Sequence, residues 1–214
     1  MTKASIILPA YNEEKNIGPV IENIPSGYEI IVVDDGSKDN TLEVAKKYGC
    51  VCIRLNRNHG KGFACKTGAK IASNENIVFM DSDGQLDAGD IPKMISALKT
   101  CGLAVGTRNI NDIPSQRKIS NNFAKVMVSK ASGKKLGDVL CGFRAIRKKD
   151  FIGLNLMKKR YEIEAEMIIK AVRSGMKIKE VPVKVKYGIG SSIPIKDSLK
   201  VTSYIINEAV KKSF

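Results

Sequence analysis

Short apolar runs recur along the first half of the chain, separated by segments whose apolar residues are spaced as on a helix. Five runs have the length and composition of buried strands: residues 4–8, 29–33, 51–55, 77–80 and 103–106. Three of the intervening segments are predicted helices: residues 41–48, 62–72 and 91–98. Asn12 is typical of a helix cap, so a further helix is expected after it, kinked or restarted at Pro19. This alternation predicts an α/β fold with a doubly wound, mostly parallel sheet between two layers of helices.

The second half is less regular. Its expected helices are residues 118–132, 161–173 and 198–212, and its expected strands are residues 141–146 and 177–185. No linker and no internal repeat divides the chain. We therefore expect one domain over residues 1–214, with two halves, 1–100 and 101–214, that differ in function.

Charge distinguishes the two halves. The chain has 214 residues and a formal net charge of +14, yet residues 1–100 hold 12 basic against 13 acidic side chains. Residues 101–214 hold 24 against 9, a net of +15. A solvated basic surface would explain only a few of these lysines and arginines. The excess indicates an anionic partner for the second half: nucleic acid, an anionic membrane surface or a phosphorylated substrate.

Composition excludes several other classes. His59 is the only histidine, so neither a histidine-based catalytic triad nor a multi-histidine metal site is expected. The five cysteines form no C-x-x-C pair, which is typical of reduced, packing cysteines in a cytosolic protein. No apolar run approaches the roughly 20 residues that span a bilayer, and residues 1–6 lack the pattern of a signal peptide.

Acidic residues directly follow two of the predicted strands. Asp81 and Asp83 end one apolar run, and Asp34 and Asp35 end an earlier one. Ligands of open α/β sheets bind outside the carboxyl ends of the strands. Mg²⁺ usually takes one or two carboxylates and completes its shell with water and substrate phosphates. The pattern therefore favours a metal and nucleotide site at this edge over a pair of solvated turns.

Two further segments suit a nucleotide. Pro9, Tyr11 and Glu13 follow the first strand, where the ring of Tyr11 can form one wall of a pocket for a nucleotide base. The segment also suits a simple strand-to-helix turn. The glycines of segment 58–62 let the backbone approach a phosphate, and Lys61 adds positive charge at a helix N-terminus. The spacing is neither that of a P-loop nor G-x-G-x-x-G.

In this order, the segments resemble the glycosyltransferases of family 2, which have the Rossmann-like GT-A fold. The matching segments are PAYNEE (9–14), VVDDGS (32–37), NHGKG (58–62) and DSDGQ (81–85). Within that family, the chain is similar to dolichyl-phosphate or polyprenyl-phosphate mannose and glucose synthases. The segments that carry this narrower likeness are GTR (106–108), CGFR (141–144), YEIEAE (161–166) and EVPV (180–183).

The resemblance implies roles for individual residues. The nucleotide would be bound by Pro9, Tyr11, Glu13, Asp35, Lys61 and Asp81, and Mg²⁺ or Mn²⁺ by Asp81, Asp83 and Gln85. The acceptor phosphate would be bound by Arg108, Arg117, Ser120 and Arg144. The catalytic residues would be Asp83, Arg108, Arg117 and Glu164. Glu164 and Glu166 would lie near the sugar, although helical spacing puts Glu162 and Glu166 on one face and Glu164 on another.

The implied activity is an inverting, metal-dependent transfer of a sugar, glucose or mannose, from a UDP- or GDP-sugar to dolichyl or polyprenyl phosphate. Residues 1–100 would bind the nucleotide sugar and residues 101–214 the acceptor. We expect a cytoplasmic protein that lies peripherally on the cytoplasmic face of an anionic membrane. Many relatives continue into C-terminal transmembrane helices, whereas this chain stops at Phe214, so it is either peripheral or a soluble portion of a longer protein.

Three alternatives remain open from the sequence. A family member with a sugar or protein hydroxyl as acceptor would use Glu164 or Glu166 as general base. A nucleic-acid-binding protein would suit the basic second half, but the chain lacks interleaved aromatic residues and any recognisable nucleic-acid motif, so no nucleic-acid partner is expected. A non-catalytic subunit that binds nucleotide sugars would be at odds with the intact pair of Asp81 and Asp83.

Overall fold

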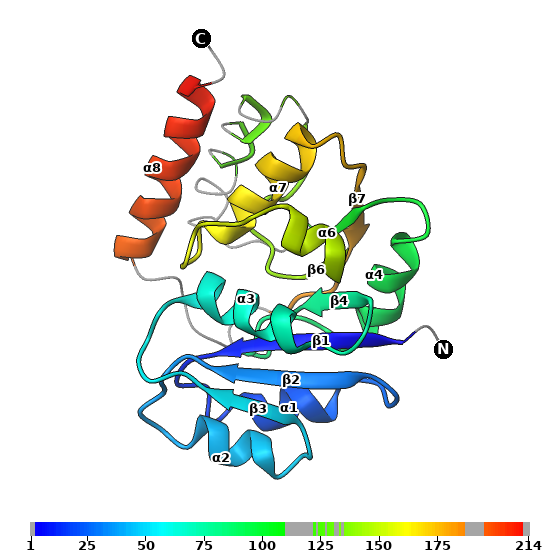
Figure 1. The fold of residues 1–214 in the computed structure, drawn as a ribbon, viewed down its shortest axis with the longest axis vertical. Helices are drawn as coiled ribbons and strands as arrows, with labels where there is room; N and C mark the ends of the chain where they lie inside the picture. Colours follow the sequence, from blue (N-terminus) through cyan, green and yellow to red (C-terminus); the bar gives the residue numbers. More distant parts are fainter. Residues whose placement is uncertain are drawn as a thin grey trace.

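The structure, a computed structural model, describes residues 3–109, 122, 124–126, 128–130, 133, 135–186 and 195–211. Within these residues, seven strands form one sheet in the order β3-β2-β1-β4-β6-β5-β7 (Figure 1). The strands are β1 (Ala4–Ala10), β2 (Glu29–Asp34), β3 (Val51–Arg54), β4 (Asn76–Phe79), β5 (Leu103–Thr107), β6 (Arg144–Arg147) and β7 (Ile178–Pro182). Neighbouring strands are parallel except at β6, which is antiparallel to β4 and β5. The predicted mostly parallel sheet is confirmed.

Helices cover both faces of the sheet. They are α1 (Ile17–Glu22), α2 (Thr41–Lys46), α3 (Lys61–Ile71), α4 (Ile91–Ala97), α6 (Lys148–Gly153), α7 (Ile163–Arg173) and α8 (Ile195–Lys211), with a 3-10 turn η1 (Ala88–Asp90) before α4. Apolar side chains of α1, α2 and α4 share a buried cluster with one face of the sheet, and those of α3, α6, α7 and α8 share a cluster with the other. The sheet is thus the middle of three layers, as predicted. Among the helices of the described ranges, none is long and apolar enough to cross a membrane.

The reversed strand β6 brings two distant loops to one edge of the sheet. Phe79, at the carboxyl end of β4, pairs with Arg144, at the amino end of β6. The residues that precede β6 therefore reach the same edge as the residues that follow β4. Since β1, β2 and β4 are parallel to one another, the acidic residues after β2 and β4 also lie at this edge.

Three helices differ from the prediction or lie partly beyond the description. Asn12 does not cap a helix, because its φ of 56° is left-handed and its Oδ1 accepts from the main-chain N–H of Lys38 (2.8 Å). Helix α1 begins only at Ile17, so residues 11–16 form a loop that docks on the loop after β2. The six-residue helix α6 is not among the helices expected from the sequence. The predicted helix 118–132 lies partly outside the described residues.

Candidate functional site

The loops at the carboxyl edge of the sheet are bonded to one another. The hydroxyl of Ser82 donates to the carbonyl of Pro9 (2.8 Å), which ties the loop after β4 to the end of β1. The buried carboxylate of Asp35 accepts from the main-chain N–H groups of His59 and Gly60, both at 2.7 Å. The predicted phosphate loop 58–62 is therefore fixed to the end of β2.

Lys61 lies between two carboxylates from distant parts of the chain. Its Nζ is 2.5 Å from Asp81 Oδ1 and 2.6 Å from Glu164 Oε1. Lys61 is the first residue of α3, Asp81 follows β4, and Glu164 lies in the first turn of α7. Burial alone would lower the pKa of Lys61, but the two carboxylates raise it well above its ordinary value. The edge of the sheet therefore carries a charged ammonium held between two acids.

The second carboxylate oxygen of Glu164, Oε2, is buried. Glu164 is 5% exposed, and its Oε2 is buried without a hydrogen-bond partner among the described residues. Leaving a buried carboxylate oxygen without a donor is costly, and native structures rarely do so. The arrangement therefore favours a ligand that brings a hydroxyl or amide donor to this oxygen.

Asp81 and Asp83 form a carboxylate pair that suits a divalent cation. Burial, and then the charge of Asp81, raise the pKa of Asp83 to about 6. A cation beside the two groups relieves this repulsion. The main-chain N–H of Gln85 donates to Asp83 Oδ1 (3.0 Å) and so fixes the turn that carries both acids. Within the described part of the chain, no three Asp, Glu, His or Cys side chains gather as a metal site.

The predicted nucleoside residues line the loops after β1 and β2. Tyr11 is 40% exposed, as a stacking platform requires, whereas Glu13 is buried. The main-chain N–H of Glu13 donates to Thr41 Oγ1 (2.8 Å), and its Oε2 accepts from Asn16 Nδ2 (2.7 Å). Burial raises the pKa of Asp35, and each of its two oxygens can accept one more bond beside the one from the 58–62 loop. Base recognition by these residues stays a prediction.

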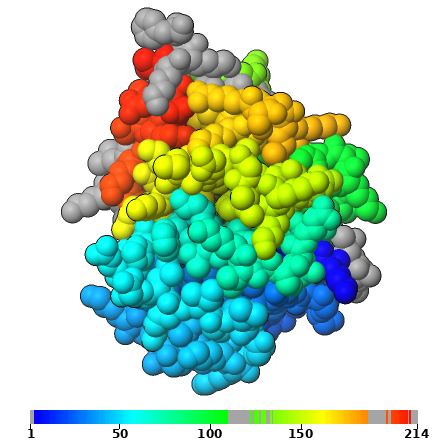
Figure 2. Space-filling model, viewed as in Figure 1, coloured from blue at the N-terminus to red at the C-terminus, as the bar shows by residue number. Residues whose placement is uncertain are grey.

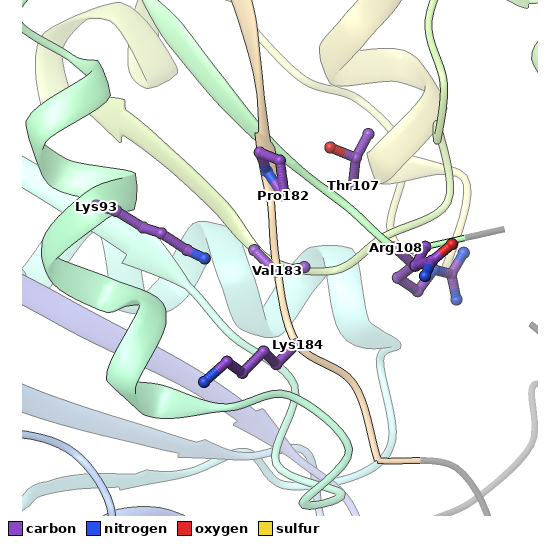
Figure 3. Close-up of a pocket in the computed structure, with 7 residues that line it drawn as sticks. Lys93, Thr107, Arg108, Pro182, Val183 and Lys184 are labelled. Carbon is purple, nitrogen blue, oxygen red and sulfur yellow. The ribbon is translucent and has the colours of Figure 1, made fainter. Parts of the chain in front are cut away.

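Arg108 is fastened to a neighbouring loop. Its guanidinium forms a bidentate pair with Asp138, with 2.5 Å between Nε and Oδ2 and 3.0 Å between Nη2 and Oδ1. Arg108 also lines a cavity of about 360 Å³ to which α4 contributes Lys93 and the segment after β7 contributes Lys184. Figure 3 shows the two lysines approaching from one side and Arg108 from the other. Much of the charge of Arg108 is thus matched inside the protein.

Arg144 has a structural position instead of the predicted one. It is 1% exposed, and its guanidinium donates to three main-chain carbonyls, those of Cys141, Val139 and Glu164. The side chain therefore braces the loop before β6 from inside the molecule. The prediction that Arg144 binds the acceptor phosphate is corrected. The predicted acceptor residues Arg117 and Ser120 lie outside the described residues.

Glu162, directly before α7, and Glu164 and Glu166 within it separate as helical spacing predicts. Glu164 meets Lys61, whereas Glu162 and Glu166 line a cavity on the side of α8. Both oxygens of Glu166 accept main-chain N–H groups, from Met157 (2.9 Å) and from the next residue. This carboxylate therefore points away from Lys61, and the prediction that Glu166 lies near the sugar is corrected.

Sequence reasoning misses Gly142 and Asp138. An ideal Cβ at Gly142 would collide with the carboxylate of Asp81, whose Cγ would be 2.6 Å away. Only glycine therefore leaves Asp81 its place beside Lys61. Gly142 belongs to a segment that carries the family resemblance, but nothing in the pattern gives it a role. Asp138 has no sequence signal, because its partner Arg108 is 30 positions away.

Comparisons with known proteins agree with this geometry. The model of "Glycosyl transferase family 2" matches residues 5–154. An uncharacterized protein of Methanocaldococcus jannaschii is 36% identical over 197 residues, which are 85% of this chain and 81% of that protein. The dolichol-phosphate mannosyltransferase of Pyrococcus furiosus is 35% identical over 198 residues, which are 84% of this chain and 55% of that protein. This chain thus spans about half the length of that mannosyltransferase.

A solved structure shares the fold. The glucosyl-3-phosphoglycerate synthase of Mycobacterium tuberculosis, crystallised with Mn²⁺, UDP and phosphoglyceric acid, superposes with a TM-score of 0.78 at 22% identity. The match covers 99% of this chain and 78% of that one. At this identity, the likeness shows the fold alone.

Proposed function

This chain belongs to glycosyl transferase family 2, and on that premise we propose that it moves a sugar from a UDP- or GDP-sugar to dolichyl or polyprenyl phosphate. The transfer inverts the anomeric centre, and glucose or mannose is the sugar. Residues 1–100 bind the donor and residues 101–214 the acceptor. The mannosyltransferase of Pyrococcus furiosus, named for dolichol phosphate, supports the lipid acceptor.

The observation that carries this proposal is the ion-paired chain of Asp81, Lys61 and Glu164 at the carboxyl edge of the sheet. An ammonium has three donors, and the two carboxylates use two of them. The third can meet a diphosphate oxygen of the donor. Glu164 Oε2, which has no hydrogen-bond partner within the part of the chain that the structure describes, can accept from a hydroxyl of the transferred sugar. The diphosphate and the sugar of a nucleotide sugar thus both find partners at this edge of the sheet.

The carboxylate pair fits a divalent cation, Mg²⁺ or Mn²⁺. Asp81 and Asp83 would hold the ion with Gln85, and the bound ion would neutralise the charge that develops on the departing nucleoside diphosphate. The Mn²⁺ and UDP bound to the Mycobacterium tuberculosis enzyme support this choice. Tyr11 would stack on the base, while Pro9, Glu13 and Asp35 line its pocket, with Asp35 accepting from the base N–H edge.

The acceptor half must supply positive charge, because two anions have to meet. A polyprenyl phosphate is already ionised at neutral pH, so its oxygen attacks without a strong base. Arg117 and Ser120, with Arg108, are the residues we assign to it. Because Asp138 already pairs with Arg108, Arg117 carries the larger share of the electrostatic work.

A second candidate is transfer to a hydroxyl acceptor, as in polysaccharide or glycoprotein synthesis. The buried, unpartnered Oε2 of Glu164 favours it, because a hydroxyl nucleophile needs a general base within hydrogen-bond reach. The two candidates differ in what they need from Glu164: a lipid phosphate needs only its hydrogen bond, whereas a hydroxyl needs its basicity.

A panel of donors tests the proposal. Purified protein is incubated with UDP- and GDP-sugars and Mn²⁺, with and without a polyprenyl phosphate, and the products are separated by chromatography. We expect one donor to be consumed much faster when the lipid phosphate is present, and a glycosylated lipid to appear. If the lipid phosphate does not change the rate of donor consumption but an added sugar hydroxyl increases it, the second candidate replaces the first.

The proposed place of action is the cytoplasmic face of a membrane, bound peripherally through the basic half. Each basic residue near an anionic surface contributes about 1 kcal/mol, and salt weakens the attraction. Sedimentation with anionic vesicles should therefore show binding at low salt and release at high salt. Absence of binding at low salt would remove the peripheral location, and tight binding of duplex DNA instead would revive a nucleic-acid partner.

A further inference from the structure

We propose that Glu166 is a positioning residue for sugar transfer. It fixes the segment Met157–Arg160, here termed the strap, and the strap in turn fixes the loop 58–62 that presents Lys61. The proposal rests on the proposed function, in which Lys61 meets the donor diphosphate. Glu166 itself touches no substrate, since its carboxylate faces away from Lys61.

Glu166 holds the amino end of the strap. It is 2% exposed, and its two oxygens accept from the main-chain N–H groups of Met157 (2.9 Å) and Lys158 (2.7 Å). Lys170, one turn further along α7, lies 2.9 Å from Glu166 Oε1 and balances the buried charge. Charge-assisted bonds of this kind are among the stronger ones in proteins. The start of the strap is thereby anchored on α7.

The strap lies directly on the start of α3. The carbonyl of Lys159 accepts from the main-chain N–H of Phe63 (2.9 Å), and the carbonyl of Lys158 accepts from Lys66 Nζ (3.0 Å). An ideal Cβ at Gly60 would be 2.6 Å from the carbonyl oxygen of Lys159. In Figure 2, yellow and yellow-green atoms of the part of the chain that includes the strap cover the cyan atoms of the α3 region. Backbone therefore packs on backbone, and a shift of the strap must move the loop.

Arg160 fixes the other end of the strap to the loop 58–62 and to α8. Its Nη2 donates to Asn58 Oδ1 (3.1 Å), and its Nη1 to Asp197 Oδ2 of α8 (3.1 Å). Asp35 holds the same loop from the opposite side, through His59 and the residue after it. The loop 58–62 is thus hydrogen-bonded both to the end of β2 and to the strap. Together with the Lys61–Glu164 ion pair, the contact with the strap joins donor-side and acceptor-side elements.

The substitution Glu166→Gln tests the chain of contacts. It keeps the shape but replaces one accepting oxygen with a donor, so one of the two strap N–H groups loses its acceptor. A misplacement of about 1 Å can change the rate of an enzyme by about 100-fold, and we expect about tenfold weaker binding of the Mn²⁺–nucleotide, read by calorimetry, and a similar rise in KM for the donor. The KM for the acceptor should change much less.

Glu29→Gln is the matched control. Glu29 accepts from the main-chain N–H of Ser73 (2.9 Å) and so also fixes a loop, but at the amino end of β2, on the opposite edge of the sheet. We expect it to lower the melting temperature without a change in nucleotide affinity. Hydrogen exchange should accelerate at residues 58–63 and 157–160 in Glu166→Gln, and only around residue 73 in Glu29→Gln.

The outcomes separate the two proposals. Unchanged affinity and unchanged exchange at residues 58–63 in Glu166→Gln would overturn the role of the strap, as would an equal loss of affinity in Glu29→Gln. If Glu166→Gln does not fold, Arg160→Met tests the contact between the strap and the loop 58–62 from its more exposed side. We then expect about threefold weaker nucleotide binding. Wild-type affinity in Arg160→Met would refute the role of the strap. A wild-type protein that binds nucleotide but transfers no sugar would end the proposed function and leave the affinity and exchange tests of the strap intact.

Discussion

The substitution Gly142→Ala should disable the site without unfolding the protein. The three nearest atoms to an ideal Cβ at this position all belong to the Asp81 carboxyl group, and its Cγ would be only 2.6 Å away. A carboxyl group at the end of a side chain can rotate aside, whereas a strand cannot. We therefore expect Asp81 to leave Lys61 while β4 and β6 keep their pairing.

The magnitude follows from what Asp81 loses. Its contact with Lys61 is a charge-assisted bond of 2.5 Å between side chains that are mostly buried. Such bonds contribute about 1.5–3 kcal/mol. Since 1.36 kcal/mol corresponds to about a tenfold change in rate, kcat/KM should fall by at least roughly 10- to 100-fold if the whole contact is lost in the transition state, and displacement of Asp81 from the proposed metal pair would add to this loss. Stability should fall by no more than this contact is worth, about 1.5–3 kcal/mol, because Glu164 still pairs with the ammonium of Lys61.

The assay compares Gly142→Ala with Gly153→Ala. A Cβ at Gly153 of α6 meets nothing within 4 Å, and alanine in a helix is favoured over glycine by about 0.5–1 kcal/mol. Initial rates of sugar transfer and thermal melting are measured for both variants. Gly153→Ala should keep full activity and melt at or above the wild-type temperature.

Two results would refute this reasoning. If Gly142→Ala keeps kcat/KM within about threefold of wild type, Asp81 either does not move or does not matter. If it loses well over about 3 kcal/mol of stability, more than the contact of Asp81 with Lys61 is worth, the backbone yields instead of the side chain, and the assumed rigidity of the edge is wrong.

Three further predictions concern single side chains. Asp83→Ala should abolish transfer by removing a carboxylate of the proposed metal pair while circular dichroism and melting stay native, and full activity in excess chelator would contradict the metal. Arg144→Met should cost about 3 kcal/mol in urea unfolding, because three buried carbonyls lose their donor, and a loss below about 1 kcal/mol would show that they find others. Arg117→Ala should reduce transfer to polyprenyl phosphate more than tenfold with donor affinity unchanged, whereas Glu164→Gln should keep measurable transfer; the reverse pattern would indicate a hydroxyl acceptor.

The sequence alone determined the order of elements and the edge at which chemistry is expected. Apolar runs and their acidic ends are local features, so β4 and the acids after it could be read directly from the chain. The separation of Glu164 from Glu166 on α7 was equally predictable, because helical geometry fixes which residues share a face. The family resemblance rests on the same local segments.

Only the tertiary structure decided which charged residues meet. The family resemblance assigns both Arg108 and Arg144 to the acceptor phosphate, yet Arg108 lines a cavity and Arg144 is buried and donates to three carbonyls. The helix expected to start at Asn12 begins only at Ile17, because the side chain of Asn12 binds the loop after β2 instead of capping a helix. Such outcomes depend on packing between remote segments, which no local period encodes.

The reversal of β6 is the clearest case. The reversal brings Gly142 against Asp81. Arg144, at the start of β6, also donates to the main-chain carbonyl of Glu164 and so helps to place Glu164 beside Lys61. Whether a strand pairs parallel or antiparallel depends on its connections and on the strands beside it, which the alternation of its own residues does not reveal. The local sequence therefore shows that acidic residues follow the strands, whereas the partners of those residues are determined by the tertiary structure.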